Sequence, residues 1–174
     1  MPRSGIGQSG RKGTGGEREA GRSFSAPISL TSKMIQGLFE THINVTDLDR
    51  SIYFYTDVLG LKLGLRQDAR RAAFLWIGAP GDSMLGLWEK PREQVIPQHL
   101  AFRATVDDVL NHAAPWLAAR NLPSHNFLKD AAQGSMVFAW MPALSVYFKD
   151  PDAHSLELIA ILPGEPRPEL GVVS

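Results

Sequence analysis

Residues 37–60, GLFETHINVTDLDRSIYFYTDVLG, are similar to residues 96–122, IPQHLAFRATVDDVLNHAAPWLAARNL, and each stretch places a histidine in its opening strand. These histidines are His42 and His99. Two copies of one unit that fold alike and meet face to face can bring such symmetry-related side chains to one metal ion. The repeat therefore predicts two similar modules that share a site.

The composition is that of a globular protein. The chain has 174 residues, of which 44% are hydrophobic and 21% charged, and this is enough for one domain with a sizeable core. It has no cysteine, which excludes disulfides, zinc–thiolate sites and a thiol nucleophile. No apolar run approaches the roughly 20 residues of a membrane helix. We therefore expect a cytoplasmic protein that has no membrane partner.

The charge is zero overall but unevenly placed. Residues 1–33 hold six Lys or Arg and two Glu, which leaves twelve basic and sixteen acidic residues beyond them. No basic cluster follows Lys33, and this argues against nucleic acid as a partner. Residues 1–33 also have few large apolar side chains, so we expect a disordered extension, with a targeting peptide as the alternative.

The first module, residues 36–90, is predicted as β-α-β-β-β. Alternation with period two from Leu38 to Val45 indicates a strand. Asp47 is expected to cap a helix, and Gly60 is expected to end it. Three further strands are expected near residues 61–67, 71–78 and 83–89.

The second module, residues 97–162, repeats this order. We expect a strand over 98–105 and a helix over 106–120 that is kinked at Pro115. Residues 129–143 are expected to form a loop or an extra hairpin that covers a site, and 163–174 an extended tail. Further strands are expected near 123–128, 135–140, 144–149 and 155–161. The predicted fold class is one α+β domain over residues 34–162.

Strand parity decides which side chains share a face of a sheet. His42 and His99 open the two modules, and Glu157 lies in the last strand. Two histidines and one carboxylate from three strands leave coordination positions open, which suits Fe2+ or Mn2+, with Zn2+ and Ni2+ as alternatives. The sequence therefore predicts a metal site of these three residues, although a strand histidine taken alone is usually a hydrogen-bonded core or surface residue.

Other candidate residues surround this set. Tyr147 lies on the strand before Glu157 and is expected to hydrogen-bond a metal-bound oxygen, with core packing as the alternative. Arg103 shares the face of His99 and is expected to hold an anion, with an ion pair to Glu40 as the alternative. The substrate-binding candidates are Asn44, Trp88 and Glu40.

The repeat also predicts a missing ligand. Overlaying MLGLWEK on SLELIA places Gly86 opposite Glu157, so the first module lacks the corresponding carboxylate. Glu89 is close by in sequence but has the opposite parity, so we expect it to face away from the ion.

Residues 41–63, THINVTDLDRSIYFYTDVLGLKL, and 145–160, SVYFKDPDAHSLELIA, resemble the vicinal oxygen chelate superfamily of glyoxalases, bleomycin resistance proteins, extradiol dioxygenases and fosfomycin resistance proteins. The resemblance covers residues 36–162 and implies two βαβββ modules, related by pseudo-two-fold symmetry, that form a U-shaped, cup-like mixed sheet around a divalent metal. It implies His42, His99 and Glu157 as ligands and Tyr147 as a site tyrosine. Ala153 replaces the usual glycine of the DPDGH turn, which implies a little backbone strain.

We therefore expect a metal-dependent enzyme whose substrate chelates the ion through two oxygens, with Tyr147 and Arg103 steering the developing charge. Dioxygenase chemistry is favoured slightly. Thiol addition to an anionic small molecule, by glutathione or another thiol, comes second, and a glyoxalase-like lyase or isomerase third. The rival from another class is a metal-free drug-binding protein of the bleomycin resistance kind. The expected assembly is a homodimer.

Overall fold

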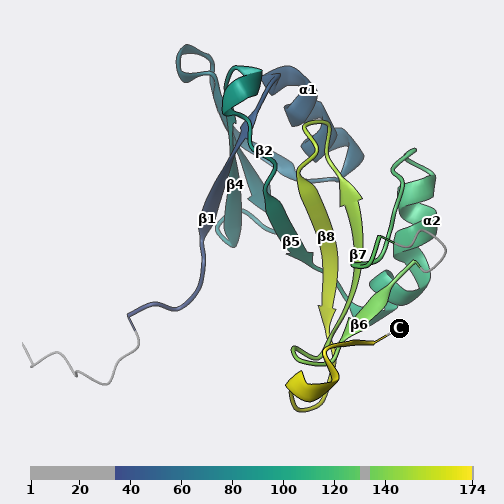
Figure 1. The fold of residues 1–174 in the computed structure, drawn as a ribbon. Helices are drawn as coiled ribbons and strands as arrows, with labels where there is room; N and C mark the ends of the chain where they lie inside the picture. The colour runs from purple at the N-terminus through teal and green to yellow at the C-terminus, as the bar shows by residue number, and fades with distance from the viewer. Residues whose placement is uncertain (1–33, 130–133, 174) are drawn as a thin grey trace, which may run out of the picture. The chain divides into compact units, whose positions relative to one another are not determined.

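Four strands form the first sheet, in the order β1-β4-β3-β2 (Figure 1). β1 runs parallel to β4, whereas β4 with β3 and β3 with β2 are antiparallel. The strands are β1 (Glu40–Val45), β2 (Lys62–Gln67), β3 (Ala72–Ile77) and β4 (Ser83–Glu89). These bounds confirm the strands expected for the first module. The computed structural model describes residues 34–129 and 134–173, so the expectations for residues 1–33 lie outside the described residues.

The helix between β1 and β2 begins and ends as its sequence predicts. The Asp47 side chain accepts a hydrogen bond from the Arg50 backbone N–H at 3.0 Å, which caps α1 (Leu48–Tyr53). α1 continues as a single π-helical stretch, η1 (Phe54–Val58). Gly60 then takes a φ of +86°, a left-handed conformation that glycine adopts without a steric penalty.

Five strands form the second sheet, in the order β5-β8-β7-β6-β9. The pattern of the first sheet recurs, because β5 is parallel to β8 and the next two pairings are antiparallel. The strands are β5 (His99–Arg103), β6 (Met136–Phe138), β7 (Ala143–Lys149), β8 (Ser155–Ile161) and β9 (Val172–Val173). The chain is thus an α+β fold of two βαβββ modules, as predicted.

Two expectations for the second module are wrong. Residues 123–128 form no strand, because only His125 pairs, in a single bridge to Tyr147. Pro123 lacks an N–H to donate and Lys129 has a φ of +62°, so the stretch is bounded by two residues that do not suit a ladder. The tail is not simply extended, since β9 adds to β6 after a short 3₁₀ turn, η5 (Pro168–Leu170). Residues 129–143 contain β6, and 130–133 lie outside the described residues.

The second helix is shorter and less regular than expected. It consists of a π-helical stretch, η4 (Asp108–His112), and α2 (Ala113–Ala118). Pro115 has no N–H for the carbonyl four residues earlier, and that carbonyl belongs to Asn111 in the π-helical stretch. The irregularity therefore falls one turn before the proline at which a kink was predicted.

Both sheets turn one face toward a common hydrophobic core. Alternate apolar residues of β1, β3 and β4 are buried in one cluster with residues of the second sheet and of both helices; members of this cluster include Ile43, Leu75, Leu85, Leu87, Tyr55, Leu117, Val146, Phe148 and Leu156. Strand pairing does not join the two sheets anywhere in the described residues. His42 and His99 alternate with core residues, so each lies on the face of its sheet that points away from the core.

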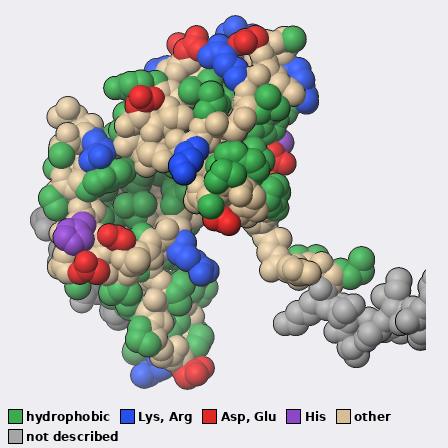
Figure 2. Space-filling model, turned by 180° about the vertical axis from the view of Figure 1, so that it is seen from behind, with side chains coloured by type: hydrophobic (Ala, Val, Ile, Leu, Met, Phe, Trp, Pro, Cys, Tyr) green, Lys and Arg blue, Asp and Glu red, His purple; other side chains and the backbone are tan. Residues whose placement is uncertain are grey.

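The surface seen in Figure 2 carries acidic and basic side chains interspersed with hydrophobic ones, without one continuous basic area on this face. Among residues 34–129 and 134–173, none of the helices has the length and apolar character that a bilayer span requires.

Candidate metal centre

The second module brings His99 and Glu157 together. β5 and β8 are parallel neighbours, and their register places Ala101 opposite Glu157 and His99 opposite Ser155. Nε2 of His99 lies 2.9 Å from Oε2 of Glu157. Glu157 is only 3% exposed, and its Oε1 is buried without a hydrogen-bond partner. An unpaired buried carboxylate oxygen is costly, so this pair fits a cation that would satisfy both oxygens.

His99 and Glu157 form the half-site of the second module, and Tyr147 lies beside it on the neighbouring strand β7. It lies opposite Glu157 in the β7–β8 register, is 6% exposed, and its ring centre is 5.8 Å from that of His99. Burial, assisted by the charge of Glu157, raises the pKa of the Tyr147 phenol to about 12. The phenol therefore remains protonated at neutral pH and can donate a hydrogen bond into the site.

Two further residues lie beside Tyr147. His125 stacks on the Tyr147 ring, with centres 5.8 Å apart and planes inclined by 13°, and its Nδ1 lies 2.8 Å from the Asn126 carbonyl oxygen. Ser145 is fully buried on the same face, and its hydroxyl oxygen has no hydrogen-bond partner. Parity places Ser145 with Tyr147 and Glu157, which is the signal that could have found it.

The first module holds His42 in a different environment. Trp88 donates its indole N–H to Nδ1 of His42 at 3.0 Å, and Nε2 of His42 lies 3.0 Å from Oε1 of Glu40. Indole is a donor only, so Nδ1 must accept and the imidazole proton must sit on Nε2. His42 is thus a neutral Nε2–H imidazole between Trp88 and Glu40. A metal would have to displace one of these two contacts.

Gly86 makes room for this imidazole. It lies opposite His42 in the β1–β4 register, and a Cβ added at Gly86 would approach Cδ2 of His42 to 2.6 Å. Phe74, opposite Gly86 on β3, packs its ring edge to face with His42, with centres 5.9 Å apart. Gly86 is the first-module equivalent of Glu157, and the His42 ring lies over it.

The two half-sites remain separate within one chain. Among the described residues, no group of three or more His, Asp or Glu side chains is placed so that it could hold a metal ion. The structure brings Glu157 to His99 and Glu40 to His42, but it does not bring His42 to the other two predicted ligands. A three-ligand centre formed by one chain alone is therefore not present in this part of the chain.

The remaining predicted residues lie around these half-sites. Nδ2 of Asn44 donates to the Gln94 carbonyl oxygen at 3.1 Å, so this amide is tied to the segment that links the modules. Glu40 faces His42, which leaves the alternative pairing with Arg103 unmade. Glu89 points to the helix side, as parity predicts, where it accepts a hydrogen bond from the Leu48 N–H at 3.0 Å.

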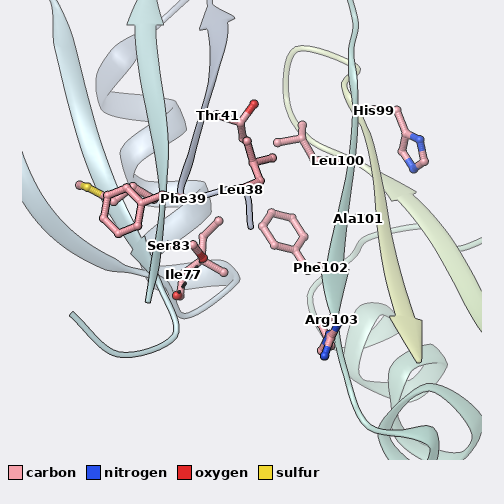
Figure 3. A pocket seen from close by; sticks show the side chains of 11 residues that line it. Leu38, Phe39, Thr41, Ile77, Ser83, His99, Leu100, Ala101, Phe102 and Arg103 are labelled. Carbon is pink, nitrogen blue, oxygen red and sulfur yellow. Dashed lines mark hydrogen bonds between the residues drawn. The ribbon is translucent and has the colours of Figure 1, made fainter. Parts of the chain in front are cut away.

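Arg103 lines a groove between β5 and the start of β1. The groove has a volume of about 370 Å³. Figure 3 shows that Leu100 and Phe102 point into it, toward Leu38 and Thr41, whereas His99 points away from it. The groove is therefore separate from the His99–Glu157 half-site.

The comparisons with known proteins agree with this architecture. The family model of the Glyoxalase/Bleomycin resistance protein/Dioxygenase superfamily matches residues 37–158. The chain belongs to this superfamily. The match spans both modules and includes every predicted metal ligand, and it confirms the resemblance seen in the sequence.

Relatives within the superfamily differ in what their names describe. The metallothiol transferase FosB of Staphylococcus saprophyticus is 27% identical over 132 residues, which is 72% of this chain and 77% of FosB. An integron cassette protein from the mobile metagenome of a Halifax Harbour sewage outfall is 35% identical, with a TM-score of 0.64, and its whole length matches 73% of this chain. A lactoylglutathione lyase from Agrobacterium tumefaciens is 21% identical, with a TM-score of 0.57, over 72% of this chain and 94% of the lyase, and it supports the fold alone.

Proposed function

We propose that this protein is a divalent-metal-dependent enzyme that acts on a small molecule able to chelate the ion through two oxygens. The observation that carries the proposal is the His99–Glu157 pair, with its Nε2 to Oε2 distance of 2.9 Å and a buried carboxylate oxygen that has no other partner. A carboxylate in this state fits a metal ligand better than a drug-binding wall. This argues against the metal-free binding protein.

The complete centre would require two copies of the chain. His42 from one copy and His99 with Glu157 from the other would supply two histidines and one carboxylate. β1 and β5 each lie at a sheet edge, with a strand on one side only in the described residues, so each is free to meet a strand of a second copy. The expected homodimer would therefore contain two such centres, each with ligands from both chains.

The bound ion would act as a Lewis acid toward the chelating oxygens of the substrate. Tyr147 would donate a hydrogen bond from its phenol to an oxygen that gains negative charge, since its raised pKa keeps the phenol protonated at neutral pH. Trp88 and Phe74, beside His42, would form an aromatic wall of the substrate space. Arg103 lines the neighbouring groove but has the strand parity of His99 on β5, so its guanidinium would hold an anionic group of a substrate that extends from the half-site toward this end of the strand.

Among the possible reactions, transfer of a thiol to the substrate is favoured by the similarity to a metallothiol transferase. The chain has no cysteine, so the thiol would come from a second substrate such as glutathione. Dioxygenase chemistry is the second candidate, because two histidines and one carboxylate are also the ligands typical of non-haem Fe2+ oxygenases.

The ligand set is tested by purification without chelator, followed by metal analysis and titration with Mn2+. We expect one Mn2+ per chain in the loaded protein and none in the His99→Ala variant. A wild-type protein that binds no divalent metal under supplementation would favour the metal-free binding protein instead.

Assembly from two copies is tested by mixing variants. His42→Ala chains and His99→Ala chains are each expected to lack a complete centre. In a mixed dimer, the intact His42 of one chain would meet the intact His99 and Glu157 of the other, so half of the centres formed in that dimer would regain Mn2+. Centres formed within single chains would gain nothing from mixing.

A further inference from the structure

His154 is completely buried at the junction between the two modules. It lies in the turn that joins β7 to β8, just before the strand that carries Glu157. Its own backbone N–H donates to Oδ1 of Asp150 at 2.7 Å, which holds the turn closed.

Both ring nitrogens of His154 bond to backbone groups of other strands or their flanks. The Gln98 N–H donates to Nδ1 at 2.9 Å, and Nε2 lies 2.8 Å from the Asn44 carbonyl oxygen. An N–H can only donate and a carbonyl can only accept, so the imidazole is neutral with its proton on Nε2. The ring therefore serves as acceptor for one module and donor for the other.

These two backbone partners lie next to the proposed metal ligands. Gln98 directly precedes His99, and its carbonyl oxygen also accepts a hydrogen bond from the Ser155 N–H at 2.8 Å. Asn44 lies two residues after His42 on the same face of β1. One side chain thus connects the strands that carry all three ligands.

The rest of the turn strengthens the same junction. Oδ1 of Asp152 accepts from the Thr46 hydroxyl at 2.5 Å and from the Arg50 guanidinium at 2.8 Å, while Asp150 accepts from the Tyr55 hydroxyl at 3.0 Å. With the Thr46 N–H bond to Oδ2 of Asp152 at 3.0 Å, five hydrogen bonds run from Asp150, Asp152 and His154 to the first module. His154 differs from the two aspartates because it alone also bonds to the residue before His99.

We infer that His154 is a positioning residue that sets the spacing between the two half-sites of each chain. This inference rests on the proposed metal centre. In a dimer with shared centres, each chain supplies His42 to one centre and His99 with Glu157 to the other. Both centres close only if the spacing within each chain matches, and the backbone bonds of His154 fix that spacing.

The experiment compares three variants of His154 in the full chain, with Mn2+ as the probe. His154→Ala removes both ring contacts. His154→Asn keeps an acceptor at the position of Nδ1 and so retains the bond from Gln98, whereas His154→Gln places a donor near the position of Nε2 and retains the bond to Asn44. His112→Asn, which alters an exposed side chain in η4, is the matched control.

We expect His154→Ala to weaken Mn2+ binding about tenfold or more, as is typical when outer partners of metal ligands are removed. The Asn and Gln variants should each recover part of this loss, and His112→Asn should bind like the wild type. Thermal unfolding without metal measures the purely structural effect, and the ring N–H resonance of His154 reports its tautomer.

Equal Mn2+ affinity of folded His154→Ala and wild type, with only a lower melting temperature, would overturn the positioning role. If His154→Ala does not fold, unchanged affinity in both the Asn and the Gln variants would overturn it. A wild-type chain that binds no Mn2+ overturns the proposed metal centre itself and the inference with it. Intact wild-type binding with no change in the variants overturns only the inference.

Discussion

The two half-sites occupy equivalent places in a repeated fold but hold their histidines in different ways. In the second module, His99 faces a carboxylate that is 3% exposed and has one unpaired oxygen. In the first module, Nδ1 of His42 accepts from an indole and Nε2 faces the exposed carboxylate of Glu40. In the second half-site a cation would replace the hydrogen bond between His99 and Glu157 and would also satisfy the unpaired Oε1, whereas in the first it would have to displace Trp88 or Glu40.

The repeat has therefore kept the strand geometry of the two modules but not the chemistry of the side chains at equivalent positions. Gly86 and Glu157 hold corresponding positions, and one leaves space for an imidazole while the other supplies a buried charge. We expect the second half-site to determine whether metal binds and the first to adjust how tightly it binds. The following predictions test this division, beginning with the largest effect.

Glu157→Gln should weaken Mn2+ binding by at least about 100-fold, because it replaces the only buried negative charge of the proposed centre with a neutral amide of similar size. Calorimetric titration measures this change. Glu165→Gln, which alters an exposed carboxylate in the tail, is the control and should bind like the wild type. Equal affinity of both variants would show that the second half-site does not determine binding.

Gly86→Ala should weaken Mn2+ binding about tenfold, because the new methyl group would lie 2.6 Å from Cδ2 of His42 and must push the ring from its place. Gly37→Ala is the matched control, since a Cβ there meets nothing within 4 Å. The test is equilibrium titration of both variants, with the melting temperature recorded in parallel. A stable Gly86→Ala protein of unchanged affinity would remove His42 from the centre.

Trp88→Phe should strengthen Mn2+ binding about threefold. The indole N–H donates a hydrogen bond to the lone pair of Nδ1, and a hydrogen bond of this kind contributes a net stabilisation of about 0.5–1.5 kcal/mol. Without it, the imidazole proton can move to Nδ1 and leave Nε2 free for the ion. Trp76→Phe, on the neighbouring strand, controls for the loss of an indole. Weaker binding by Trp88→Phe would mean that Trp88 supports the bound state instead.

The last prediction concerns the effect of the Tyr147 phenol on the free energy of unfolding, which should change only at alkaline pH. Its pKa is raised to about 12 by burial, whereas a tyrosine in the unfolded chain ionises near pH 10. The unfolded state therefore loses the proton first, and the free energy of unfolding should fall as the pH rises from about 10 toward 12. Urea titrations of Tyr147→Phe should show a smaller fall over this range, while the exposed Tyr53→Phe should follow the wild type.

Local pattern was enough to predict most of the fold. Alternation with period two located β1, strand-forming residues bounded by turn signals located β3, β4, β7 and β8, and capping by Asp47 with a left-handed Gly60 located the first helix. The predicted strain at Ala153 is also present, since this residue has a φ of +68°. Pattern failed at residues 123–128 and in the tail, where pairing depends on a partner strand that the local sequence does not specify.

Residue order alone shows which side chains share a face of each strand, because parity follows from the two-residue period of the extended backbone. It thereby placed His42, His99 and Glu157 away from the core. Which of these side chains meet could not be read from residue order, because it depends on how the two sheets pack across a shared core. Within one chain, His99 contacts Glu157, whereas His42 contacts Trp88 and Glu40. His154 is buried between the modules.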